Sequence, residues 1–143
     1  VPFGGDYFPD PSPDGTRVVL STNRGDQDGP RRIVVRDVGT GADLDLGVHG
    51  TYPRWSPVGE DIAFLRTGQP EVLTLIRSDG TNPRAILPRT ENFSFHGIGW
   101  SPDGEWLVTD DQGGLVVIQI ATGLIVPLWP IGNYLYDPSW KAE

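Results

Sequence analysis

Short apolar segments separated by polar turns follow one another along the whole chain, and they recur in sets of four. The segments are three to six residues long and most are rich in Val, Ile and Leu, a pattern that predicts strands rather than helices. The expected strands are Asp6–Phe8, Arg17–Ser21, Arg32–Arg36, Asp43–Leu46, Gly50–Tyr52, Asp61–Leu65, Val72–Arg77, Arg84–Leu87, Ser94–Ile98, Glu105–Thr109, Leu115–Ile120, Leu124–Leu128 and Tyr134–Tyr136.

One turn motif recurs through these sets. It reads Pro11-Ser12-Pro13-Asp14-Gly15, then Trp55-Ser56-Pro57-Val58-Gly59, then Trp100-Ser101-Pro102-Asp103-Gly104, and Trp140 begins a fourth copy without the turn. The first positions of the copies are separated by 44, 45 and 40 residues. A period of about 40–45 residues is typical of four-stranded propeller blades.

The residue types of this motif predict a structural role. Pro presets the turn, Gly relieves strain at its end, and Asp can accept hydrogen bonds from neighbouring N–H groups. Trp is expected to pack between stacked sheets. Pro11 replaces Trp in the first copy, and Val58 replaces Asp in the second. The structural residues are therefore Ser12, Pro13, Asp14, Gly15, Trp55, Ser56, Pro57, Gly59, Trp100, Ser101, Pro102, Asp103 and Gly104.

The repeated Trp-Ser-Pro-Asp-Gly resembles the repeat of the TolB-type propellers, a WD40-like family. The strand endings Arg36-Asp37-Val38-Gly39-Thr40-Gly41 and Ile120-Ala121-Thr122-Gly123 are similar to that family too, and the resemblance covers about residues 6 to 140. It implies an all-β propeller section with blades at about 6–47, 50–88 and 94–129 and a surplus strand at about 134–140. It further implies protein binding in the periplasm or cell envelope.

Three blades are fewer than the four to eight of a typical propeller ring. A blade must also cover its apolar faces with neighbours. We therefore expect closure either by oligomerisation, with two copies forming a six-bladed ring, or within a larger assembly.

Composition narrows the classes of partner. Gly (19) and Pro (14) leave little room for long helices, and the net charge of −8 argues against a nucleic acid partner. No apolar stretch approaches the ~20 residues of a membrane span, so no membrane insertion is expected. The absence of cysteine excludes disulfides and zinc–thiolate sites. We expect no cofactor and no bound metal.

Several other residue patterns suggest sites, but ordinary roles explain them better. His49 and His96 precede Gly near two inner strands and would need a third ligand to hold a metal. Asp26 and Asp28 resemble the opening of a calcium loop, but the basic residues that follow disfavour a cation. The tripeptide Arg24–Asp26 matches an integrin-binding motif, but matches of three residues are common by chance. Asp110 and Asp111 are expected in a turn.

The aromatic residues near the end of the chain are the one interface candidate: Trp129, Tyr134, Tyr136 and Trp140. The motifs of nucleophilic and phosphate-binding enzymes are missing. We therefore expect a non-enzymatic protein-interaction or scaffold module whose partners include a second copy of itself. Two alternatives remain: a propeller segment accessory to a prolyl-oligopeptidase-type serine peptidase, and a small-ligand or carbohydrate site at the channel mouth.

Overall fold

The computed structural model describes residues 4–68, 71–88, 97–111 and 114–128, and within them the chain is all-β with no helix. The surplus strand expected at 134–140 lies outside these residues. The eleven strands are β1 (Asp6–Pro11), β2 (Arg17–Thr22), β3 (Arg32–Asp37), β4 (Asp43–Trp55), β5 (Asp61–Arg66), β6 (Val72–Arg77), β7 (Arg84–Pro88), β8 (Ile98–Trp100), β9 (Trp106–Asp111), β10 (Gly114–Gln119) and β11 (Ile125–Leu128).

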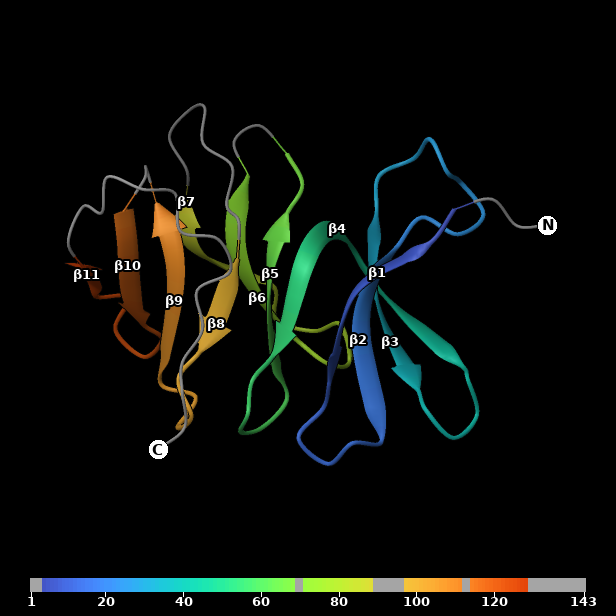
Figure 1. Ribbon diagram of the computed structural model, residues 1–143, viewed down its shortest axis with the longest axis horizontal. Coiled ribbons are helices and arrows are strands. Elements are labelled where there is room, and N and C mark those ends of the chain that lie inside the picture. The colour runs from blue at the N-terminus through green and yellow to red at the C-terminus, as the bar shows by residue number, and fades with distance from the viewer. Residues whose placement is uncertain (1–3, 69–70, 89–96, 112–113, 129–143) are drawn as a thin grey trace.

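The strands form three four-stranded antiparallel units. The first seven join in one sheet in the order β1 to β7, and β8 to β11 form a second sheet. The long strand β4 is shared, because its first part pairs with β3 and its second part with β5. We call β1–β3 with the first part of β4 blade 1, the second part of β4 with β5–β7 blade 2, and β8–β11 blade 3. The protein is thus a partial β-propeller, whose blades follow one another across Figure 1.

The junction of blades 1 and 2 differs from the sequence prediction. Separate strands were expected at 43–46 and 50–52, but the outer strand of blade 1 continues into the inner strand of blade 2 as β4. Gly47 has a φ of 73°, which lets the backbone bend without ending the strand. Gly47 and Gly50 therefore lie where the strand crosses from blade 1 to blade 2.

The core lies in two seams between neighbouring blades. Side chains of β5 alternate between them: Ile62 and Phe64 face blade 1, whereas Ala63 and Leu65 face blade 3. The first seam contains Val19, Ile33, Val35, Leu46, Trp55, Ile62, Phe64 and Ile76. The second contains Ala63, Leu65, Leu73, Leu75, Ile98, Leu107, Val116 and Ile118.

The repeated turns are held by their serines. The Ser12 hydroxyl donates to the Asp14 carboxylate at 2.7 Å and accepts the Arg17 N–H at 3.0 Å. Ser101 makes the same contacts with Asp103 and the Trp106 N–H. Where Val58 replaces Asp, the Ser56 hydroxyl donates instead to the Val58 carbonyl oxygen at 2.6 Å. The turn therefore survives the substitution by using a backbone acceptor.

These turns predict a loss of stability in acid. Hydrogen bonds from the Ser12 hydroxyl and then from Thr16 lower the pKa of Asp14 to about 2, from an ordinary value of 3.8. The charged form thus stabilises the fold above pH ~4, and this contribution is lost as the pH falls through about 2. Thermal unfolding between pH 5 and pH 2 should show Asp14→Asn less stable than wild type at pH 5, with the difference shrinking toward pH 2. A difference that is independent of pH would contradict this prediction.

Candidate functional site

The inner strands β1 and β4 share an unusual backbone feature. Phe8 and Tyr52 have φ angles of 54° and 52°, in the left-handed region, and each precedes a proline. The register of both strands shifts at these points, between Tyr7 and Asp10 in β1 and between Thr51 and Arg54 in β4. A bulky residue in this region costs about 1–3 kcal/mol and is often found at functional sites.

The bulges bring aromatic rings together across the first seam. The rings of Phe8 and Tyr52 lie with centroids 4.3 Å apart, and Tyr52 also packs against the core of the second seam. The Arg31 guanidinium lies over the Tyr7 ring, 3.9 Å from its centroid, and 5.7 Å from that of Phe8. We call Tyr7, Phe8, Arg31 and Tyr52 the aromatic–arginine cluster.

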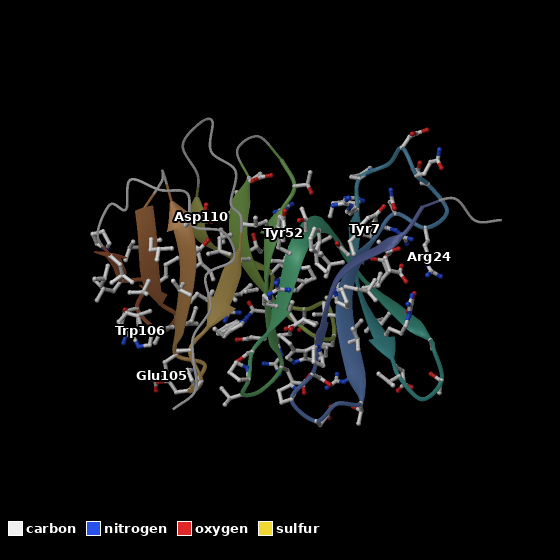
Figure 2. The ribbon with its side chains drawn as sticks, in the orientation of Figure 1. Tyr7, Arg24, Tyr52, Glu105, Trp106 and Asp110 are labelled. Atoms are coloured by element: carbon white, nitrogen blue, oxygen red, sulfur yellow. The ribbon has the colours of Figure 1, made fainter. Side chains whose placement is uncertain are left out.

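This cluster lies at the end of the blades opposite the Ser-Pro-Asp-Gly turns. We call it the loop end, because the loop at 23–31 joins β2 to β3 there. Figure 2 shows Tyr7 and Tyr52 toward this end, whereas Glu105 and Trp106 lie at the turn end. The Arg31 carbonyl accepts the Gly50 N–H at 2.9 Å, which ties the end of the loop to the crossing in β4.

Arg31 differs from the neighbouring arginines in its ion pairing. Arg24 and Arg36 both pair with Asp6, and Arg32 pairs with Asp45. Among the residues that the structure describes, Arg31 has no carboxylate partner. A guanidinium stacked on a ring keeps its N–H edges available for a carboxylate or another planar anion. The cluster can therefore bind a group that combines an apolar surface with negative charge.

Polar contacts also join the inner strands of neighbouring blades. The Asp10 carboxylate of blade 1 accepts the Trp55 backbone N–H of blade 2 at 2.7 Å. Burial raises the pKa of Asp10 more than this hydrogen bond lowers it. In the second seam, the Trp100 ring N–H donates to the Arg54 carbonyl oxygen at 3.0 Å.

The turn end of the first seam carries a separate ion pair. The Arg17 guanidinium lies 3.0 Å from the Glu60 carboxylate and 4.8 Å from the centroid of the Trp55 ring. Hydrogen bonds from Ser78 and then from Arg17 lower the pKa of Glu60. Arg17 therefore joins blade 1 to blade 2 through both charge and ring contact.

The structure places the residues of the repeat motif in two groups. Ser12, Ser56, Ser101 and Trp55 are buried, and Trp100 is half-buried. The turn residues are exposed, apart from the half-buried Gly104: Pro13, Asp14, Gly15, Pro57, Gly59, Pro102 and Asp103.

The other candidate residues do not come together. His49 is exposed on β4, and His96 lies outside the described residues. No group of three or more His, Cys, Asp or Glu able to hold a metal is found in the described parts of the chain. Asp26 and Asp28 are exposed in the 23–31 loop, where Arg24 pairs with Asp6 at 2.9 Å.

Two further expectations concern the last third of the chain. The expectation of a turn at Asp110 and Asp111 is wrong. Both residues belong to β9, where they pair with Leu115 and Gly114 of β10. The interface candidates Trp129, Tyr134, Tyr136 and Trp140 lie outside the described residues.

The aromatic–arginine cluster was not predicted from the sequence. A signal was present, because an aromatic-Pro pair occurs three residues before the first motif position in two copies, at Phe8-Pro9 and Tyr52-Pro53. The matching position of the third copy is Gly97. Because the third copy lacks the aromatic-Pro pair, the pair does not follow the period of the three repeats.

The chain is similar to several solved propeller structures. Over 87% of its length it matches TolB from Acinetobacter baumannii (16% identity, TM-score 0.70, 32% of that chain). It also matches an oligogalacturonate lyase solved in complex with manganese, with 22% identity and a TM-score of 0.68, over 42% of that chain. A third match is the β-propeller domain of the Trilobed protease from Pyrococcus furiosus, which has an open velcro topology. Its identity to this chain is 17%, with a TM-score of 0.65, over 42% of that chain. No family model and no curated protein matches the chain.

These similarities establish a TolB-like β-propeller fold. The chain spans between 32% and 42% of the length of the three structures, so it corresponds to a part of each. Within the described ranges it has no helix of the length and apolarity needed to cross a membrane.

The comparison corrects the expectation that the chain is not an enzyme. That expectation rested on missing catalytic motifs and is wrong, because the same fold occurs in an oligogalacturonate lyase over 87% of this chain. A propeller can draw the residues of a site from loops of several blades, so a search for contiguous motifs does not detect it.

Proposed function

We propose that this chain is a section of a larger β-propeller that acts as a protein-interaction module, with its partner bound at the loop end of the first seam. The observation that carries the proposal is Arg31, a half-buried guanidinium stacked on Tyr7 beside two aromatic residues of strained backbone. Tyr and Arg are enriched among the residues that dominate binding energy at interfaces.

Further blades would come from a second copy or from a larger assembly. Three blades are fewer than a typical ring needs, and the similar structures are all longer than this chain. The resemblance to TolB also supports a location in the periplasm or cell envelope as part of this proposal.

The experiment compares Arg31→Ala with Arg77→Ala, which removes an exposed arginine of β6 at the turn end. Light scattering over a concentration series measures self-association, and capture from an extract of the source cells measures binding to other proteins. Arg31→Ala should weaken partner binding at least about fivefold, whereas Arg77→Ala should leave it unchanged. Equal binding by wild type and both variants would refute the proposed site.

Ligand binding at the same end is a second candidate function. A ring face beside a guanidinium suits a sugar that carries a carboxylate, and one similar structure is an oligogalacturonate lyase. Calorimetric titration of the protein with oligogalacturonate tests this candidate, and a titration without binding heat would remove it.

A role as an accessory propeller of a serine peptidase is a third candidate. It is supported by the similarity to the propeller domain of the Trilobed protease. The catalytic domain would then be a separate domain, because the strands that the structure describes all belong to blades.

A further inference from the structure

The outer face of blade 1, which points away from blade 2, differs from the matching faces of the other blades. Arg36, Ile76 and Ile118 hold the same place, because the next residue in each strand pairs with the first residue of the preceding strand. Ile76 packs against blade 1 and Ile118 against blade 2, and both are fully buried. At this central seam position, blade 1 carries a charged side chain.

Arg36 is the centre of an ion-pair network that extends over this face. Its Nε and Nη2 atoms bind both oxygens of Asp43 at 2.6 and 2.8 Å, and its Nη1 lies 2.8 Å from Asp6. Arg24 also pairs with Asp6, at 2.9 Å, and Arg32 pairs with Asp45 at the same distance. Three arginines thus meet three aspartates, and the network carries no net charge.

The network reaches all four strands of the blade. Asp6 belongs to β1, Arg32 and Arg36 to β3, and Asp43 and Asp45 to β4. On β2, the Thr22 hydroxyl donates to Asp6 at 2.8 Å. Burial disfavours the charged form of Asp6, but hydrogen bonds from Arg36 and Thr22 outweigh it and lower the pKa.

The apolar centre of this face is already covered. Leu20 and Val34 lie on the same side of the sheet as Arg36 and are only 3% and 2% exposed. The side chains at the margin, in contrast, reach water: Arg32 is 41% exposed and Asp45 is 43% exposed. The face therefore offers a neighbour charged groups that are paired with one another and little uncovered apolar area.

We infer that the outer face of blade 1 is a water-facing end of the array of blades, so that further blades join the array beside blade 3 and not against this face. A blade docked there would take six paired charges out of water, and ions of satisfied pairs regain little from new contacts. Repeat arrays commonly end in a unit with a polar outer face. This inference is independent of the binding site proposed at the loop end.

Thiol labelling tests the inference directly, because the chain has no cysteine of its own. Asp45→Cys places a thiol on the outer face of blade 1. Thr109→Cys places one at a fully buried position as the matched control. The rate of reaction with a small thiol reagent is measured for folded protein over a range of protein concentrations and for the same variants in urea.

Asp45→Cys should react within about threefold of its rate in urea at every concentration, and Thr109→Cys at least about 100-fold more slowly than in urea. Protection of Asp45→Cys that is lost on dilution would overturn the inference, because a second copy would then cover the face. Protection that persists at every concentration would overturn it as well.

A second variant tests whether the charges keep the face free. Arg36→Ile with Asp43→Val removes one positive and one negative charge and makes the face resemble that of blade 2. Light scattering should show new, concentration-dependent association of this double variant, with circular dichroism confirming the β fold. A wild-type oligomer that dissociates on this double substitution would overturn the inference, and so would a folded double variant whose mass equals that of wild type.

Discussion

Replacing Phe64 by alanine is expected to lower the free energy of unfolding by about 3–5 kcal/mol. Phe64 is fully buried and is among the largest buried side chains of the described residues. It lies on β5, an interior strand of blade 2, and faces blade 1 across the first seam. Its removal leaves a cavity that neither blade can fill, because the strands of each blade are held by a ladder of hydrogen bonds.

Urea unfolding, followed by tryptophan fluorescence, measures this loss. Val58→Ala is the control, since Val58 is 51% exposed in a turn and its truncation should change the free energy by no more than about 0.5 kcal/mol. A loss below about 1 kcal/mol for Phe64→Ala would show that the two blades do not depend on this contact.

The blade architecture was accessible from the sequence because its signals are local. The turn of Ser12 to Gly15 needs only neighbouring residues: the Ser12 hydroxyl, the Asp14 carboxylate and the Arg17 N–H lie within five positions of one another. A local motif that recurs with one period reports the repeating unit directly. The strand β6 was predicted with its observed bounds for the same reason.

The aromatic–arginine cluster was not accessible in this way. Tyr7 and Arg31 meet only after the loop at 23–31 has folded back, and Phe8 meets Tyr52 only across a seam. Their contact depends on left-handed φ angles at two aromatic residues, a conformation that propensity argues against. The tertiary structure imposes that conformation, so the aromatic-Pro pairs of two repeats could mark the positions but not the contact.

The charged face of blade 1 could be predicted from the sequence in part. Aligning the repeats position by position would have placed Arg36 opposite Ile76 and Ile118. The alignment alone could not show that Asp43 and Asp6 neutralise Arg36, because these aspartates lie on two other strands, β4 and β1. The sequence could therefore show that Arg36 departs from the other repeats, but not that its charge is paired.

Replacing Gly50 by alanine is expected to destabilise the protein by about 1–3 kcal/mol through overpacking. Gly50 lies where β4 crosses from blade 1 to blade 2, and its φ is not in the left-handed region. An added Cβ would lie 2.4 Å from the Leu65 carbonyl oxygen and 2.5 Å from Cδ2 of Phe64. One of these is a backbone atom, so the crossing itself must shift, and with it the hydrogen bond from Gly50 to Arg31.

Gly39→Ala is the matched control, since its Cβ would meet only the Asp37 carboxylate at 3.4 Å. That substitution should be neutral or slightly stabilising, because alanine restricts the unfolded chain. Equal stability of the two variants in urea would contradict the prediction. In a double-mutant cycle, Gly50→Ala should cost less when Phe64 is already alanine, because one of its two clashes is gone while the contact with the Leu65 carbonyl persists.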